Sequence, residues 1–301
     1  MKQINIFIAG ITGQDGYYLS KKYSQKGYNV VGLSRKNRQK TKYSQKVIKT
    51  NYKESHLIRL IKKYKPKIIF NLAAETNPKL SWVDLIKKQN SITNINLSFL
   101  NSILKTNSKI KYFHASSSEI FGISKKKSNE ISKYSPNNPY GCFKLSAHLM
   151  VQIFREKYKL FLVNGILFNH ESPKKDKNFL SSTIVRIANQ IKKGKATKLT
   201  LDTPYPIRDF AYAEDITDAI YLIMKLKKPE DFIISGGNIL SVDNLAKGIF
   251  KEMKINKNKI FYRAFDRQND IKIGDTKKLR KITGWTPKYK GAKFLKKIIS
   301  D

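Results

Sequence analysis

Short apolar runs alternate with longer amphipathic stretches through the first half of the chain. The apolar runs predict strands at residues 4–9, 29–33, 47–49, 67–72, 111–115 and 161–167. Between them the sequence predicts helices at residues 16–26, 55–64, about 84–105 and 139–158. Strands that alternate with helices are typical of a parallel sheet covered by helices on both faces. We therefore expect an α/β fold built on a doubly wound parallel sheet.

The pattern is less regular after residue 168. Helices are predicted at residues 179–193 and 242–253, with strand signals near 197–201 and 232–234. The sequence contains no clear linker, so we expect a smaller, interleaved C-terminal lobe over the mouth of the cleft. The predicted division is a first domain at 1–167 and a second lobe at 168–301, with residues from about 207 to 226 returning to the first domain.

Length and composition narrow the class of protein. With 301 residues, 40% of them hydrophobic, the chain is long enough to bury a full core. Its single cysteine, Cys142, excludes an internal disulfide framework and fits a reducing compartment. The N-terminal apolar run is too short for a signal peptide, and no stretch reaches the ~20 apolar residues of a membrane helix. We expect a cytoplasmic protein with no membrane partner.

Basic residues dominate the charge, with 60 Lys and Arg against 22 Asp and Glu, a formal net charge of +38. A charge of this size raises the expectation of a nucleic-acid or anionic-membrane partner. Here the lysines are spread along the whole chain, and together with abundant Asn and Ile they indicate an AT-rich genome as much as any partner. We expect no nucleic-acid partner, although the charge should attract anionic substrates in a salt-dependent way.

The first predicted strand–helix junction carries a glycine-rich turn, Gly10-Ile11-Thr12-Gly13-Gln14-Asp15-Gly16. Glycines at this spacing allow a tight turn and a close approach of a pyrophosphate to the N-terminus of the following helix. The second predicted strand is followed by Arg35 and Lys36 rather than by an acidic residue. A basic pair favours the 2′-phosphate of NADP over the 2′-hydroxyl of NAD, although any loop in so basic a chain can carry such residues.

Tyr140 and Lys144 lie four residues apart in a predicted helix and therefore share one face. A nearby ammonium favours the phenolate form of tyrosine and makes it a better general base. The alternative is an exposed pair without function. Ser117 and Glu119 follow a predicted strand just upstream and add a hydroxyl and a carboxylate. Together with the glycine-rich turn, these residues indicate an enzyme that acts on nucleotide sugars.

Taken in order, the glycine-rich turn, Asn71-Leu72-Ala73-Ala74, Ser117 and Tyr140-x-x-x-Lys144 resemble the extended short-chain dehydrogenases/reductases. Within that superfamily the chain is most similar to the GDP-mannose 4,6-dehydratase family. The similarity is strongest in residues 10–16 and in residues 164–173, Asn-Gly-Ile-Leu-Phe-Asn-His-Glu-Ser-Pro. Residues 115–122 are similar to the family's Ala-Ser-Thr-Ser-Glu-Leu-Tyr-Gly. The resemblance extends to the C-terminus through Arg208-Asp209-Phe210 and Gly284-Trp285-x-Pro287.

The resemblance implies a Rossmann-like NADP-binding domain, a substrate-binding lobe, and the loss of water from GDP-mannose or a related nucleotide sugar. It implies that Tyr140 takes the proton of the 4-hydroxyl and that Lys144 assists it and orients the nicotinamide ribose. Ser117, at the family's Thr position, would hydrogen-bond the 4-oxygen. Glu119 would remove the C5 proton and then protonate the departing 6-hydroxyl, giving GDP-4-dehydro-6-deoxymannose.

Further contacts are carried over from the family. Besides Tyr140 and Lys144, the expected cofactor contacts are Gly10, Thr12, Gly13, Gln14, Asp15, Gly16, Arg35, Lys36, Leu72, Ala73, Ala74, Leu167, His170 and Lys175. The expected substrate contacts are Ser81, Asn169, Asn178, Arg208 and Arg267, where the arginines are suited to a diphosphate. The sequence contains no Cys/His cluster, so we expect no metal site. The family implies a homodimer or homotetramer, although the loop after the second strand is shortened here.

Other functions remain open at this stage. A 4-reductase or an epimerase of the same superfamily needs only the Ser-Tyr-Lys set, whereas a dehydratase also needs a carboxylate beside C5. Glu119 favours the dehydratase, although a similar Glu occurs in related decarboxylases and epimerases. A non-catalytic basic binding protein with this fold is a third alternative, against which the presence of Ser117, Glu119, Tyr140 and Lys144 argues.

Overall fold

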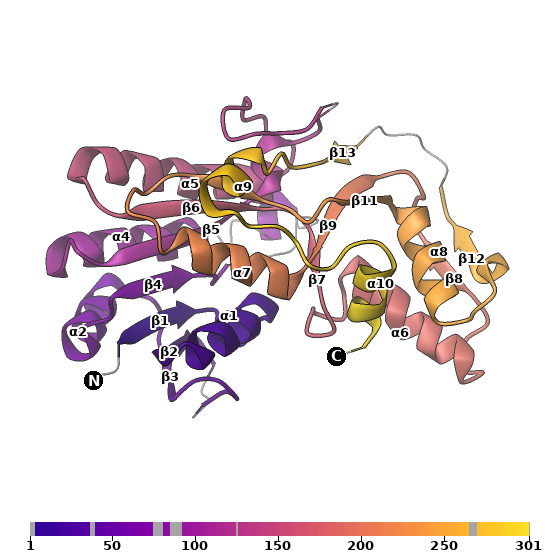
Figure 1. Ribbon diagram of the computed structural model, residues 1–301, viewed down its shortest axis with the longest axis horizontal. Coiled ribbons are helices and arrows are strands. Elements are labelled where there is room, and N and C mark those ends of the chain that lie inside the picture. Colours follow the sequence, from indigo (N-terminus) through magenta and orange to yellow (C-terminus); the bar gives the residue numbers. More distant parts are fainter. Residues whose placement is uncertain are drawn as a thin grey trace.

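A seven-stranded sheet and a smaller lobe of short strands and helices make up the computed structural model (Figure 1). The structure describes residues 4–36, 40–74, 81–84, 92–124, 126–264 and 270–300. The large sheet has the order β10-β6-β5-β4-β1-β2-β3, and all neighbouring strands are parallel. Its strands are β1 (Asn5–Ala9), β2 (Asn29–Ser34), β3 (Lys46–Lys49), β4 (Ile68–Asn71), β5 (Lys111–Ser117), β6 (Leu162–Leu167) and β10 (Phe232–Ile234).

The predicted α/β fold with a Rossmann-like doubly wound parallel sheet is confirmed. The order of the strands reverses between β1 and β4, because β1 pairs with β2 on one side and with β4 on the other. In sheets of this type the crevice at such a reversal, at the carboxyl ends of the strands, is where ligands bind. The fold therefore directs the search for a site to the loops that follow β1, β4, β5 and β6.

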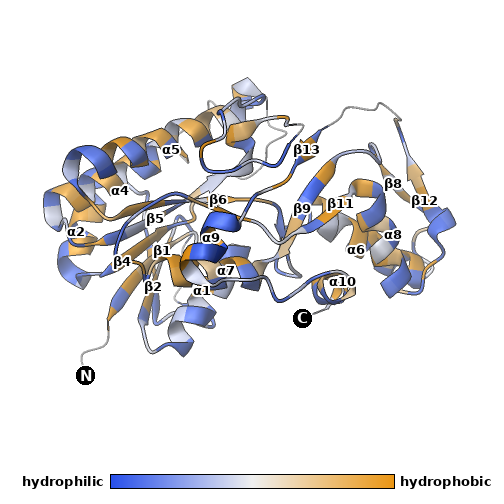
Figure 2. Cartoon of the chain, turned by 45° about the horizontal axis from the view of Figure 1, so that its top comes forward, coloured by the Kyte–Doolittle hydropathy of each residue, from blue (hydrophilic) through white to orange (hydrophobic). Residues whose placement is uncertain are grey.

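Helices cover both faces of the sheet because alternate side chains of each strand point in opposite directions. Ile6 and Ile8 of β1 belong to one apolar layer, and Phe7 and Ala9 to the other. Apolar residues concentrate in the strands between these layers (Figure 2). The first layer includes α1 (Gln14–Gln25), α7 (Ala213–Ile223) and α9 (Lys277–Thr283), and the second α2 (Glu54–Tyr64), α4 (Thr93–Thr106) and α5 (Pro139–Tyr158).

The smaller lobe is built around strand β9. This strand pairs antiparallel with β11 and parallel with β7 and β13. A separate pair, β8 with β12, lies beside helices that share one apolar cluster with it. The elements of the lobe are β7 (His170–Glu171), α6 (Leu180–Lys192), β8 (Leu199–Leu201), β9 (Ile207–Tyr212), β11 (Asn238–Ser241), α8 (Val242–Glu252), η3 (Lys257–Lys259), β12 (Ile260–Tyr262), β13 (Ile271–Lys272) and α10 (Ala292–Ile299).

The chain crosses between the two parts several times. Of the stretch expected to return to the first domain, α7 packs in the large-sheet layer, but β9 belongs to the small sheet. The return also includes two elements that the sequence placed in the second lobe or left unassigned. Strand β10 pairs with β6 at the edge of the large sheet, and α9 contributes Leu279 to its core. The chain returns to the large sheet at this point because β10 pairs with β6, and no local pattern in the sequence predicts that pairing.

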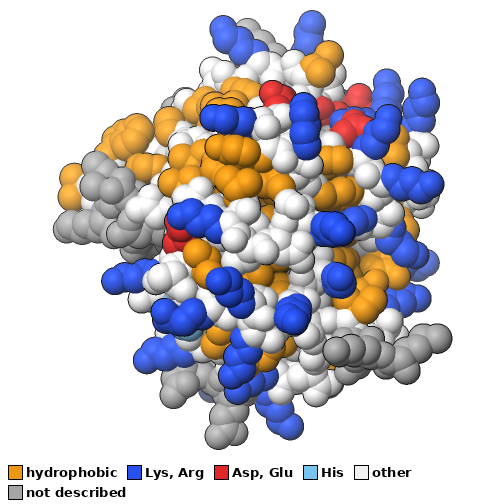
Figure 3. All heavy atoms as spheres, turned by 90° about the vertical axis from the view of Figure 1, so that its left-hand side faces the viewer, with side chains coloured by type: hydrophobic (Ala, Val, Ile, Leu, Met, Phe, Trp, Pro, Cys, Tyr) orange, Lys and Arg blue, Asp and Glu red, His pale blue; other side chains and the backbone are white. Residues whose placement is uncertain are grey.

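On the face shown in Figure 3, Lys and Arg side chains are scattered among apolar and uncharged polar ones, and few Asp or Glu side chains are seen. Among the helices that the structure describes, none is long and apolar enough to cross a membrane.

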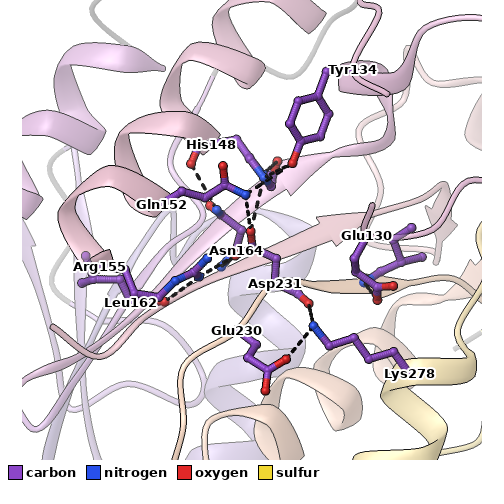
Figure 4. Close-up of polar contacts among 12 residues, drawn as sticks. Glu130, Tyr134, His148, Gln152, Arg155, Leu162, Asn164, Glu230, Asp231 and Lys278 are labelled. Atoms are coloured by element: carbon purple, nitrogen blue, oxygen red, sulfur yellow. Dashed lines mark hydrogen bonds and ion pairs between the residues drawn. The ribbon is translucent and has the colours of Figure 1, made fainter. Parts of the chain in front are cut away.

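A buried carboxylate, Asp231, fastens β10 to its neighbours (Figure 4). Its oxygens accept hydrogen bonds from Arg155 Nη1 at 2.6 Å and Gln152 Nε2 at 2.7 Å, and His148 Nε2 lies 3.4 Å away. Lys278 of α9 donates to the backbone oxygen of Asp231 at 2.9 Å. Burial alone would raise the pKa of Asp231, but hydrogen bonds and charge attraction from His148 and Arg155 hold it well below its usual value.

We expect Arg155→Met to destabilise the protein, because it leaves the Asp231 carboxylate buried without one of its charged partners. Loss of one member of such a pair costs about 3 kcal/mol or more of the free energy of unfolding. Urea unfolding measures the change. The control is Arg186→Met, which removes an exposed arginine of α6 and should stay within about 0.5 kcal/mol of the wild type. Equal stabilities of the two variants would contradict this account of β10.

Candidate active site

A cavity of about 400 Å³ opens at the carboxyl ends of β1, β4, β5 and β6. Its lining comes from the loops after these strands, from the start of α5 and from the segment that leads into α6. The predicted residues that line it are Gly10, Thr12, Gly13, Gln14, Asp15, Gly16, Leu72, Ala74, Ser117, Glu119, Tyr140, Lys144, Leu167, Asn169, His170 and Lys175. The structure thus brings most of the predicted site into one cavity.

The three glycines of the first loop are needed for different reasons. Gly10 has a φ of +83°, and a Cβ there would lie 2.9 Å from the backbone carbon of Leu72. A Cβ at Gly16 would lie 2.4 Å from the Gly10 oxygen. Gly13 has an ordinary φ of −84°, and a Cβ there would meet only the Gly10 oxygen, at a normal 3.4 Å. The fold therefore requires glycine at positions 10 and 16. At position 13 the fold leaves room for a side chain, so the remaining reason for glycine is a ligand that approaches the backbone closely from the cavity.

The glycine-rich loop is tied to β7 and to the segment that follows β7 by polar contacts. His170 Nε2 lies 3.0 Å from Asp15 Oδ2, and Lys175 Nζ donates to the His170 oxygen at 2.7 Å. Gln14 Nε2 donates to the same oxygen at 3.1 Å. Burial would raise the pKa of Asp15, but the charges of His170 and Lys175 lower it overall. Burial would lower the pKa of His170, but Asp15 raises it overall. Residues predicted as separate cofactor contacts thus form one charged network.

Tyr140 and Lys144 are both buried, with exposed fractions of 8% and 4%, which excludes the exposed-pair alternative. The ammonium of Lys144 lies 5.7 Å from the centre of the Tyr140 ring and donates to the Ala115 oxygen at 2.8 Å. Burial lowers the pKa of Lys144 to about 8, although the charge of Asp15 acts in the opposite direction. The ammonium is therefore mostly protonated at neutral pH.

Ser117 and Glu119 lie where β5 passes into the short helix η2 (Ser118–Phe121). The Ser117 hydroxyl accepts a hydrogen bond from the Glu119 backbone N–H at 3.2 Å. One Glu119 oxygen accepts from Asn138 Nδ2 at 2.6 Å, and the other lies 2.6 Å from Lys272 Nζ. A Cβ at Gly141 would lie 2.6 Å from the backbone oxygen of Glu119, so the start of α5 packs directly on η2. This close packing sets the position of Glu119 relative to Tyr140.

The family model described as GDP-mannose 4,6 dehydratase matches residues 7–298 of this chain. The chain belongs to this family. It is 31% identical over 320 residues to GDP-mannose 4,6 dehydratase 1 of Arabidopsis thaliana, which covers 98% of this chain and 88% of that protein.

The fold of this chain is also found in solved structures of low sequence identity. A dTDP-glucose 4,6-dehydratase of Bacillus anthracis in complex with NAD has a TM-score of 0.85 at 20% identity, covering 98% of this chain and 95% of that one. RMD of Pseudomonas aeruginosa, complexed with NADPH, has a TM-score of 0.84 at 18% identity, covering 99% and 98%.

Some residues suggested by membership of the GDP-mannose 4,6 dehydratase family lie away from the cavity. Arg208 hydrogen-bonds the Asp270 backbone oxygen at 2.8 Å and pairs with the Asp270 carboxylate. Ser81 donates to Asp84 at 2.7 Å in an exposed turn. Four more predicted contacts do not line the cavity. Ala73 is partly buried against the core, and Arg35, Lys36 and Asn178 are exposed. Arg267 lies outside the described residues.

The sequence did not indicate two partners of Glu119 that the structure shows. Asn138 had a local signal, because Asn followed by Pro is typical of a helix N-terminus, and its oxygen accepts the Gly141 N–H at 2.8 Å. Lys272 had none, since it is 153 residues from Glu119 in the chain. The cavity is also lined by Ala115, Ser116, Ser118, Phe168, Lys174, Asp176 and Phe179. Within the described ranges, no group of three or more His, Cys, Asp and Glu residues could hold a metal ion.

The Asp15–His170 pair should make stability depend on pH. Because the folded pKa of His170 is raised above its unfolded value of about 6.5, the pair stabilises fully below that value and loses its effect as the pH rises through the folded pKa. We expect His170→Gln to destabilise the protein more at about pH 6 than at about pH 9. Urea unfolding at both pH values measures this. In an Asp15→Asn background the difference between the two pH values should shrink, and an unchanged difference would contradict the pairing.

Proposed function

We propose that this protein is a nucleotide-sugar 4,6-dehydratase that converts GDP-mannose to GDP-4-dehydro-6-deoxymannose. Relatives named GDP-mannose 4,6 dehydratase over nearly the whole chain support this substrate. The observation that carries the proposal is the carboxylate of Glu119 in the same cavity as Ser117, Tyr140 and Lys144. The last three suffice to oxidise an alcohol, but loss of water also requires a group that moves the C5 proton.

The proposed cofactor is NADP. Two features at Gly13 support a bound dinucleotide. The fold does not require the absence of a side chain there, and the N-terminus of helix α1 has no side-chain cap, which leaves its N–H groups available to a phosphate. Arg35 and Lys36, exposed at the end of β2, would contact a 2′-phosphate. When bound, the nicotinamide would accept a hydride from C4 of the sugar and return it to C6, while C5 regains a proton that balances the one taken from the 4-hydroxyl by Tyr140. The structural neighbours were determined with NAD and with NADPH, so the basic pair is the specific support for NADP.

In this proposal Tyr140, as the phenolate, takes the proton of the 4-hydroxyl. The ammonium of Lys144 stabilises the phenolate by its charge and would bind the ribose of the cofactor. The Ser117 oxygen already accepts the Glu119 N–H, so its own proton is the donor for the developing 4-keto oxygen. Burial of all three strengthens these interactions, because water is excluded.

Glu119 acts in the second stage. Once C4 is a ketone, the proton on C5 is acidic, and the carboxylate removes it. The same group then gives that proton to the 6-oxygen, which leaves as water. A single residue can perform both transfers only if its carboxylate is held in place, and the contacts with Asn138 and Lys272 provide this.

The division of labour proposed for the chain follows the two parts of the fold. The large-sheet layer holds the cofactor and the smaller lobe holds the sugar nucleotide. Exposed apolar side chains on the second helix layer, Leu104 of α4 with Leu149 and Ile153 of α5, support association into a homodimer or homotetramer.

The direct test is to incubate the purified protein with GDP-mannose and a catalytic amount of NADP⁺ and to follow the product by mass spectrometry. We expect a product lighter by one water, with Tyr140→Phe and Glu119→Gln each slowing its formation by about 100-fold or more. Inversion without loss of water, or lasting consumption of NADPH, would instead identify an epimerase or a reductase. No turnover of any nucleotide sugar would contradict the proposal.

Gly13→Ala should weaken cofactor binding without destabilising the fold. A methyl group there keeps the phosphate from the backbone N–H groups, and the loss of one charged hydrogen bond costs about 1.5–3 kcal/mol, at least tenfold in affinity. Titration with NADP⁺ and thermal unfolding measure the two effects. Gly16→Ala is the contrast, because its Cβ would overlap the Gly10 oxygen and should lower the melting temperature. Wild-type affinity in Gly13→Ala would contradict the assigned pyrophosphate position.

A further inference from the structure

A buried lysine from near the end of the chain contacts the proposed proton-transfer residue. Lys272 lies on β13 with an exposed fraction of 6%, and its Nζ is 2.6 Å from Oε1 of Glu119. Strand β13 pairs with β9 of the smaller lobe. The contact therefore joins the lobe proposed to bind the sugar nucleotide to the end of β5 in the large sheet.

The two oxygens of Glu119 are held from different elements. Lys272 contacts Oε1, and Asn138 Nδ2 donates to Oε2 at 2.6 Å. Asn138 is itself fixed, because its side-chain oxygen accepts the Gly141 N–H at the start of α5. With each oxygen bound by a donor from a different element, the orientation of the carboxylate is determined.

The charge of Lys272 matters as well as its position. Burial disfavours an ionised carboxylate unless a nearby cation compensates. The ammonium, 2.6 Å from Oε1, balances the charge of the partly buried carboxylate and fixes the place of that oxygen.

We propose that Lys272 is a positioning residue that holds and orients the Glu119 carboxylate for the elimination of water, an inference that rests on the proposed function. In this step the C5–H bond breaks and its proton moves to the Glu119 carboxylate. The electron pair forms the C5=C6 bond as the C6–O bond breaks. Glu119 passes the proton to the departing oxygen, which leaves as water, and Lys272 keeps its own proton throughout.

The test compares Lys272→Met, which removes the charge, with Lys272→Arg, which keeps it. We expect Lys272→Met to lower kcat for GDP-mannose at least about tenfold while KM stays within about twofold. In single turnover the reduced nicotinamide should form at the wild-type rate, whereas loss of water slows, so that the 4-keto sugar and reduced cofactor accumulate. Lys272→Arg should recover most of kcat. A purely structural role would not slow one half-reaction alone.

The matched control is Lys277→Met, since that side chain is 92% exposed and its removal takes the same charge from the surface. It should have wild-type kcat and melting temperature. Wild-type kcat in Lys272→Met, or equal slowing of both half-reactions, would overturn the inference. The wild type is measured beside the variants: if it does not release water from GDP-mannose, the proposed function itself fails and this inference fails with it.

Discussion

Ionised side chains cost several kcal/mol each to bury unless charged or hydrogen-bonding partners compensate, and the candidate active site depends on such compensation. Asp15 is paired with His170, and Glu119 with Lys272, at the carboxyl ends of the central strands. Each pair joins elements that lie more than a hundred residues apart in the chain. The charges are thus kept in place by the tertiary structure, and the tertiary structure is in turn held together at these points by the charges.

The interleaving of the two parts follows from the same constraint. Strand β13 of the smaller lobe brings Lys272 to Glu119, and β7 brings His170 to the glycine-rich turn. The return of β10 to the large sheet, fixed by Asp231, places the chain so that β11 and later β13 can pair with β9. Packing at the edge of the large sheet and the geometry of the proposed proton transfer are therefore linked through one path of the chain.

The sequence predicted the parts of this structure that depend on local pattern. The strands of the large sheet through β6 and helix α5 were predicted to within a few residues, because buried apolar runs and amphipathic stretches are local signals. Gly10, Ser117, Tyr140 and Lys144 were found because they belong to short motifs at fixed spacing. The partners Lys272 and Asp231, and the place of β10, depend on contacts between distant segments, which spacing alone does not determine. Arg208, a substrate contact suggested by the family resemblance, pairs with Asp270, a partner that the sequence did not indicate.

The central claim is that one cavity oxidises C4, removes water across C5 and C6, and reduces C6 without releasing the intermediate. The most direct test is to supply GDP-mannose with deuterium at C4, in the presence of a catalytic amount of NADP⁺, and to locate the label in the product by NMR. The account predicts that the deuterium appears at C6 of the same sugar. Deuterium that remains at C4, or that accumulates in the free reduced cofactor, would contradict it.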